Sequence, residues 1–153
     1  DGCNDLLVAA PGVSTGSGAV CGSLGPLVGS KSASSCSVLI SGQSGYGEFG
    51  WSVASIGDDN WGGEENILVG VPYVTGDKSS SGVAYLFRGP LSGSMRASDA
   101  DASFLGRHSS GAAGAAVARA GDFNGDGSDD LLIGGYAANS STGMAYVMFG
   151  GGF

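Results

Sequence analysis

The sequence predicts an all-β fold built from many short strands. Its 153 residues include 31 glycines but only four prolines, and 42% of the residues are hydrophobic. Glycine therefore punctuates short apolar segments, as it does between strands joined by tight turns, and does not mark a disordered tract. Strand-like segments also recur in a fixed order along the chain. The length suits one modest domain.

Ten segments have the composition of short strands. They lie within 1–11, 18–22 and 36–40, then 51–56, 66–72, 82–89 and 102–105, and finally 111–122, 130–134 and 143–150. Each is apolar, short and bounded by glycine or polar turn residues. The Ala-rich run at 111–120 has helix propensity, but its counterpart at 51–56 suits a strand, so we expect a strand in both places.

The segments form an internal repeat. Asp122 lies 64 residues after Asp58, and each is followed by a loop and two further strands. The chain opens inside a third copy, because Asp1 and the residues after it match Asp126 onward. Four short antiparallel strands per repeat predict β-propeller blades. We therefore expect one partial propeller domain over 1–153, comprising a partial blade at 1–46 (strands 2–4), a full blade at 47–110 and a partial blade at 111–153 (strands 1–3).

About two and a half blades cannot close a ring alone. Open blade edges would leave unpaired backbone groups and apolar faces in water. We therefore expect other propeller blades as partners, supplied by the same longer polypeptide or by neighbouring chains.

The segment from Asp122 to Asp130 predicts a calcium site. Oxygen-bearing side chains fall at loop positions 1, 3, 5 and 9, with glycine at position 6, and Ca²⁺ prefers such ligands. Position 12 is Ile133, inside an apolar run, whereas an EF-hand requires a glutamate there and flanking helices. The expected ligands are the side chains of Asp122, Asn124, Asp126 and Asp130 and the backbone carbonyl of Ser128. The alternative is a solvated acidic turn that binds no ion.

The other two copies hold poorer versions of this loop. The middle copy begins with Asp58 and Asn60 but has Gly62 and Asn66 at positions 5 and 9. The first copy retains only the last two acidic positions, Asp1 and Asp5. We expect calcium to bind weakly or not at all in both, unless Glu64 or Glu65 supplies a further ligand in the middle copy.

Charge and motifs exclude several function classes. The formal net charge is −8 with only six Lys and Arg, which argues against nucleic acid and anionic membrane surfaces as partners. No apolar run is long enough to span a bilayer. There is no P-loop, zinc set or histidine partner for a nucleophile, so we expect no enzymatic activity. Asn139-Ser140-Ser141 is an N-glycosylation sequon, which favours a secreted protein only mildly.

Three kinds of motif recur in order along the chain. Phe49-Gly50 opens one strand, Leu7-Val8-Ala9-Ala10-Pro11 and Leu68-Val69-Gly70-Val71-Pro72 close another, and the Asp122–Asp130 loop lies between such strands. Together these motifs resemble FG-GAP repeats, the blade units of the integrin α-subunit β-propeller. The resemblance implies that the calcium loop joins the first and second strands of a blade. It also implies an extracellular or cell-surface role in adhesion or ligand recognition. The last copy departs from the pattern, with Gly134-Gly135-Tyr136 for Gly-Ala-Pro and either Gly111-Ala112 or Gly114-Ala115 for Phe-Gly.

Three functions remain open at the level of sequence. The first is a non-enzymatic, calcium-stabilised segment for extracellular adhesion, recognition or surface assembly. The second is a propeller region that accompanies the catalytic domain of a secreted hydrolase or lyase. The third is a sugar-binding lectin, for which the aromatic residues Trp51, Trp61, Tyr73 and Tyr136 would supply stacking faces.

Two further expectations concern particular side chains. Cys21 ends one strand and Cys36 begins its antiparallel neighbour, so a disulfide can join them and leave Cys3 free or paired to another chain. The variable connections between strands 2 and 3 lie opposite the calcium loops, and binding residues tend to lie on such loops. There we expect a ligand face carrying Tyr73, Asp77, Lys78 and Tyr136. The alternative is that these loops are simply solvated, or glycosylated at Asn139.

Overall fold

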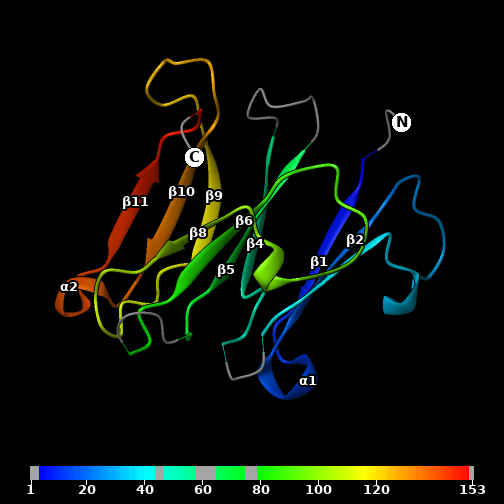
Figure 1. Cartoon of the computed structure of the whole chain (residues 1–153), viewed down its shortest axis with the longest axis horizontal. Helices are drawn as coiled ribbons and strands as arrows, with labels where there is room; N and C mark the ends of the chain where they lie inside the picture. Colours follow the sequence, from blue (N-terminus) through cyan, green and yellow to red (C-terminus); the bar gives the residue numbers. More distant parts are fainter. Residues whose placement is uncertain (1–3, 44–46, 58–64, 75–78, 152–153) are drawn as a thin grey trace.

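The computed structural model describes residues 4–43, 47–57, 65–74 and 79–151 of the chain. Within these residues the fold is all-β, with eleven strands in three sheets and only short helical turns. The sheets lie side by side and do not close into a ring (Figure 1). The predicted fold class is therefore confirmed.

The first sheet contains β1 (Leu6–Ala10), β2 (Ala19–Ser23) and β3 (Val38–Ser41), which pair antiparallel in that order. Its fourth member is β7 (Gly93–Arg96), which comes from much later in the chain and pairs in parallel with β3. The sequence did not predict β7. Its residues, Gly-Ser-Met-Arg, have neither an apolar run nor alternation, and its pairing partner is remote in sequence.

The second sheet is a complete four-stranded blade. It contains β4 (Ser52–Gly57), β5 (Asn66–Val71), β6 (Val83–Phe87) and β8 (Ala102–Leu105), all antiparallel in that order. Strand β5 is buried along its whole length, as expected for the centre of the molecule.

The third sheet contains β9 (Ala116–Gly121), β10 (Asp130–Gly135) and β11 (Met144–Met148), in the order β11-β10-β9. The Ala-rich run does end in a strand, as predicted. Tertiary pairing with β10 therefore overrides its helix propensity.

Four helical turns connect the strands. α1 (Val13–Gly16) joins β1 to β2 and α2 (Ala138–Ser141) joins β10 to β11. The 3-10 turns η1 (Ala33–Ser35) and η2 (Ala97–Asp99) each precede the last strand of a blade. No helix in the described part of the chain is long and apolar enough to cross a membrane.

The core consists of two apolar clusters, each between neighbouring sheets. One cluster joins the first sheet to the second, and its buried members include Val20, Ile40, Phe49, Ile67, Val69 and Phe87. The other joins the second sheet to the third and includes Ile56, Leu68, Leu86, Leu131 and Ile133. Alternate residues of β5 therefore face opposite neighbours, and this places the three sheets in succession.

Glycines at equivalent positions let consecutive blades approach closely. Gly18 forms an isolated parallel β-bridge with Phe49. Gly82, 64 residues later, forms the same kind of β-bridge with Ala113. A Cβ on Gly18 would lie 2.1 Å from the Phe49 carbonyl oxygen, and one on Gly82 would lie 2.2 Å from that of Ala113. The counterpart of Phe49-Gly50 is therefore Ala113-Gly114. Both expected alignments, Gly111-Ala112 and Gly114-Ala115, were wrong because glycine and alanine are too frequent there to fix the register.

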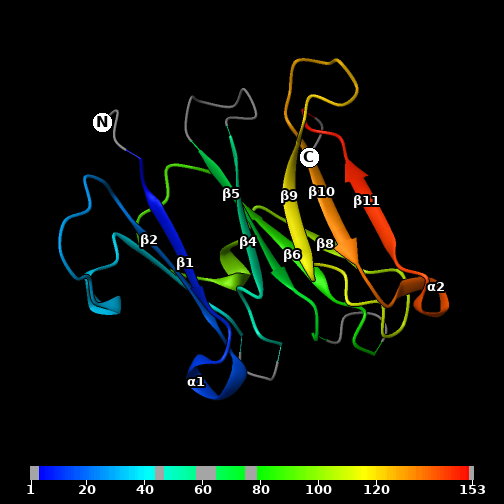
Figure 2. The ribbon, with the colours of Figure 1, turned by 180° about the vertical axis from the view of Figure 1, so that it is seen from behind.

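The two ends of the sheets carry different features. The loop from β9 to β10 projects at one end, whereas α1 and α2 lie at the opposite end (Figures 1 and 2). This arrangement separates the predicted calcium loop from the predicted ligand face.

Candidate functional site

The Asp122–Asp129 loop leaves β9 and enters β10, where the strand register shifts between Asp130 and Leu131. The loop therefore joins the first two strands of its sheet, as the family resemblance implied. Gly125 and Gly127 have φ angles of 78° and 89°, a left-handed backbone that suits glycine and allows the chain to turn tightly.

Asp122 organises the loop. Its Oδ1 accepts hydrogen bonds from the backbone N–H of Gly125 at 2.7 Å and of Asp126 at 3.0 Å. Its Oδ2 accepts from the N–H of Gly127 at 2.9 Å. Three backbone N–H groups thus donate to one exposed carboxylate, and the positive ends of their dipoles point toward its negative charge.

Asn124 and Asp126 continue the pattern. Asn124 accepts from the Asp126 N–H at 3.0 Å and donates from Nδ2 to Asp126 Oδ2 at 2.7 Å. Asp126 Oδ1 accepts from the N–H of Ser128 at 2.9 Å. The Asn124 side chain and then the Ser128 backbone hold the pKa of Asp126 below its usual value.

Asp130 is fully buried and joins two parts of the third sheet. Its Oδ2 accepts from the N–H of Phe123 and its Oδ1 from that of Gly150, both at 2.8 Å. The same position recurs in the other sheets, where Asp5 accepts from Gly25 at 2.8 Å. In the middle sheet Asn66 accepts from Gly89 at 3.0 Å. The last position of the loop, Asp or Asn, therefore binds the backbone at the end of the third strand in each sheet, a role that the sequence did not reveal.

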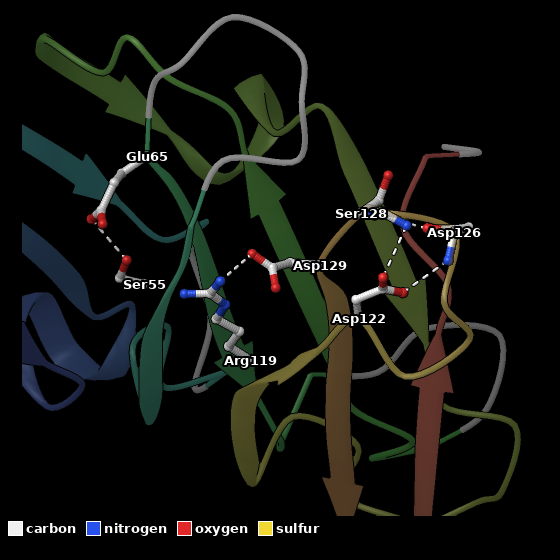
Figure 3. Close-up of polar contacts among 8 residues, drawn as sticks. Ser55, Glu65, Arg119, Asp122, Asp126, Ser128 and Asp129 are labelled. Carbon is white, nitrogen blue, oxygen red and sulfur yellow. Dashed lines mark hydrogen bonds and ion pairs between the residues drawn. The ribbon is translucent and has the colours of Figure 1, made fainter.

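The loop also contacts the neighbouring sheet. Asp129 forms an ion pair with Arg119 of β9 (Figure 3). This pair lies against Gly57 at the end of β4. A Cβ on Gly57 would be 2.8 Å from Asp129 Oδ2. Close by, Ser55 donates to Glu65 at 2.8 Å.

The loop residues match the chemistry of Ca²⁺, because carboxylate and amide oxygens predominate and each oxygen that accepts one N–H keeps a lone pair. As the side chains lie, no three Asp, Glu, His or Cys residues among those described converge as a metal cage. The oxygens point to the loop's own amides. The residue types of the loop therefore fit the chemistry of a calcium ion.

The other predicted metal residues can be placed only in part. Asp1, Asp58 and Asn60 lie outside the described residues. Asp5 is described, and it serves as an exposed acceptor for Gly25.

The opposite end of the sheets carries an aromatic cluster, defined here as Trp51, Tyr73 and Tyr136. The rings of Trp51 and Tyr73 meet edge-to-face with centroids 5.2 Å apart. A side-chain hydrogen bond with Tyr136 raises the pKa of Tyr73, with smaller contributions from burial and from the charge of Glu48. Trp51 is 45% exposed and Tyr136 is 61% exposed.

Two of the four predicted ligand-face residues, Tyr73 and Tyr136, are thus brought together from separate sheets. Asp77 and Lys78 lie outside the described residues. Neither Trp51 nor Glu48 was predicted as part of this face, although Trp51 was a candidate for stacking on sugars. The sequence signal that could have placed Trp51 on this face is its position directly after Phe49-Gly50, at the start of a strand.

Cysteine pairing and the sequon complete the predicted sites. Cys21 and Cys36 form the expected disulfide, whereas Cys3 lies outside the described residues. Asn139 is exposed, and its Nδ2 donates to Thr142 Oγ1 at 3.1 Å. Its glycosylation stays a prediction.

Comparisons with known proteins identify related sequences. A family model described as FG-GAP repeat matches residues 113–148. Integrin alpha pat-2 of Caenorhabditis briggsae is 31% identical over 106 residues, which make up 68% of this chain and 8% of that protein. The chain therefore spans only a small part of the length of this relative.

Proposed function

We propose that this FG-GAP repeat protein, which is similar to an integrin α subunit, is a calcium-stabilised propeller segment for extracellular adhesion or recognition. Its role is non-enzymatic and its partners are further propeller blades together with a protein or glycan ligand. The disulfide between Cys21 and Cys36 fits the oxidising environment that such a location requires.

The observation that carries the calcium assignment is the fold of the Asp122–Asp130 loop. Backbone N–H groups hold the side chains of Asp122, Asn124 and Asp126 within one tight turn. The side chains of these three residues would bind Ca²⁺ together with the Ser128 carbonyl and Asp130. The bound ion would offset the repulsion among neighbouring carboxylates and fix the loop between β9 and β10.

Calorimetric titration of the full chain with Ca²⁺, after removal of metal by chelation, tests this assignment. We expect binding, and a rise in thermal stability that grows with calcium concentration because the ion binds only the folded loop. Asp126→Asn should weaken binding at least tenfold.

Asp129→Asn is the matched control, since it removes one negative charge from the same loop but lies outside the ligand pattern. The affinity of this variant for Ca²⁺ should stay within about twofold of the wild-type affinity. Equal losses in both variants would reveal a general attraction of cations to an acidic loop. Absence of any calcium-dependent stabilisation would refute the assignment.

The recognition surface is the aromatic cluster of Trp51, Tyr73 and Tyr136. Exposed aromatic side chains supply a large contact area at low entropic cost and are enriched where proteins bind partners. These three come from the connections of two sheets, at the end opposite the calcium loop.

Glycan binding is the second candidate, since the exposed faces of Trp51 and Tyr136 could stack on sugar rings. A glycan array and an extracellular-protein array, each probed with the wild-type chain and with Tyr136→Ala, distinguish the two classes of ligand. Tyr136→Ala should abolish most binding to whichever array responds. Phe123→Ala is the control, because Phe123 is also an exposed aromatic residue but lies on the Asp122–Asp130 loop at the other end of the sheets.

A further inference from the structure

The connections between the third and fourth strands repeat closely in the first two sheets. Gly25-Pro26-Leu27-Val28-Gly29-Ser30 corresponds to Gly89-Pro90-Leu91-Ser92-Gly93-Ser94, 64 residues later. The backbone agrees as well. Gly29 and Gly93 have φ angles of 66° and 68°, and each segment then leads through an extended residue into a 3-10 turn, η1 or η2.

In the later copy this segment forms β7, which extends the preceding sheet. Gly93–Arg96 pairs in parallel with Val38–Ser41, and the Gly93 N–H donates to the Ser37 carbonyl at 3.0 Å. Leu91 and Met95 pack against the core cluster between the first and second sheets. Strand β7 thus fastens one blade to the outer strand of the blade before it.

In the first copy the same segment has no such partner among the described residues. Residues 29–32 are exposed and lie in no sheet. Three of them, Gly29, Lys31 and Ser32, line a concavity of about 640 Å³ on the open face of the first sheet, together with Leu6, Val8 and Leu27. This concavity is where a preceding sheet would lie.

We propose that residues 29–32 are a docking strand that binds, in parallel, the outer edge strand of a blade of this same repeat type placed before β1. The inference concerns assembly and does not depend on calcium binding or on the aromatic cluster.

The interface inside the chain identifies the occupant. Leu6 and Val8 of the first sheet correspond to Ile67 and Val69, which follow Asn66 as Leu6 and Val8 follow Asp5. Ile67 and Val69 are covered by the preceding sheet, whereas Leu6 and Val8 are 46% and 49% exposed. An apolar face and a strand segment beside it therefore both lack the partner that their counterparts have.

A chain lengthened by one blade tests the proposal. Residues 47–129 are fused ahead of residues 5–153, so that Asp5-Leu6-Leu7 replaces Asp130-Leu131-Leu132 and the repeat continues. The added blade brings its own copy of 102–105 as the outer strand. Hydrogen–deuterium exchange then compares residues 29–32 in the original and lengthened chains, with the paired strand at 6–10 as the folding reference.

We expect the amides at 29–32 to exchange at least tenfold more slowly in the lengthened chain, approaching residues 93–96 of the original chain. Gly29 corresponds to Gly93, whose N–H donates to the neighbouring strand. Every second N–H of a parallel strand points to the same neighbour, so the Lys31 N–H should also donate to the added blade and the Ser30 N–H should not. Lys31→Pro should abolish the gain in protection, and Ser30→Pro, the matched control, should preserve it.

Unchanged exchange at 29–32 with residues 6–10 still protected would overturn the proposal. Protection that arises in the original chain on raising its concentration would assign the segment to a second copy and overturn it equally. Should the lengthened chain fail to fold, the original chain with excess synthetic peptide 99–107 provides the same readout, and the absence of protection there would also overturn it.

Discussion

At the residue scale, Asp130 has a structural role that the sequence does not reveal. Its place at the end of the acidic loop predicts a calcium ligand, yet its two oxygens accept the N–H groups of Phe123 and Gly150 inside the protein. Buried donors that lose an acceptor are costly. Asp130 therefore stabilises the third sheet whether or not calcium is bound.

Asp130→Asn should destabilise the chain even in the presence of a chelator. The variant keeps one acceptor oxygen but places an NH₂ group against an N–H donor, at a cost of about 1–3 kcal/mol. Urea unfolding in excess chelator measures the change in free energy of unfolding. Asp129→Asn, which loses only a partly exposed ion pair, should cost less than about 1 kcal/mol. If Asp130→Asn were as stable as the wild type in chelator, Asp130 would not stabilise the calcium-free chain.

Tyr73 links the aromatic cluster to pH. Its pKa is raised above 10.0, chiefly by the Tyr136 side chain, so the neutral form is favoured in the folded state. The associated stability is fully present below pH 10 and is lost as the pH rises through the folded-state pKa. Tyr136→Phe should return the pKa of Tyr73 toward 10.0 and shrink this alkaline loss.

Ring resonances of the tyrosines, followed by NMR against pH, measure the shift directly. Tyr85 is the internal control, because burial alone raises its pKa and the substitution should leave it unchanged. If the pKa of Tyr73 also stayed unchanged in Tyr136→Phe, burial rather than the hydrogen bond would be its cause.

Other residues of the candidate site show how far sequence reasoning reaches. Spacing alone predicted the loop from Asp122 to Asp130, because its oxygen-bearing residues lie within nine residues of one another in the chain. The pairing of Tyr73 with Tyr136 and the ion pair of Asp129 with Arg119 depend on how strands turn and sheets align. Such contacts carry no local signal, although the ligand-face expectation did select both tyrosines.

At the scale of elements, local pattern predicted ten of the eleven described strands because each has an apolar run or a close repeat counterpart. Strand β7 escaped notice for a physical reason. Its four residues have low strand propensity, and it exists because β3 offers a free edge more than 50 residues earlier in the chain. Non-local pairing of this kind becomes visible only when the sheets are placed together.

The disulfide constrains the connection between β2 and β3. Cys21 and Cys36 are 15 residues apart, and a bridge that closes a loop of this length contributes about 3 kcal/mol in the chain-entropy description. Replacing both residues with serine should lower the free energy of unfolding by about that amount. Thiol titration of the denatured, unreduced wild type should return at most one free cysteine.

Treatment with reductant separates the bridge from the substitution itself. The wild type should lose stability on reduction, whereas the double serine variant should not change. Three titratable thiols in the wild type would contradict the pairing and, with it, the argument for an oxidising location.

At the scale of the whole molecule, the chain has a covered interior and two open end faces. The second sheet is enclosed by its neighbours through the two core clusters. The first sheet exposes Leu6 and Val8 on its outer face, and the third sheet leaves Val147 exposed. Each sheet contains a corresponding strand with a three-residue apolar run, but the burial of that run depends on whether another sheet lies against it.

This difference yields a paired prediction at equivalent positions. Val8 and Val69 occupy the same place in β1 and β5, yet Val8 is 49% exposed and Val69 is 0% exposed. Val69→Asn would bury an unpaired amide and remove apolar burial, at a cost of about 2–5 kcal/mol. Val8→Asn should cost less than about 1 kcal/mol, because its amide can bond to water.

Urea denaturation curves of the wild type and both variants, measured at low protein concentration, give the changes in free energy of unfolding. A Val8→Asn variant as unstable as Val69→Asn would mean that the outer face of β1 is already covered within the chain, and the open-ended arrangement of sheets would then be wrong.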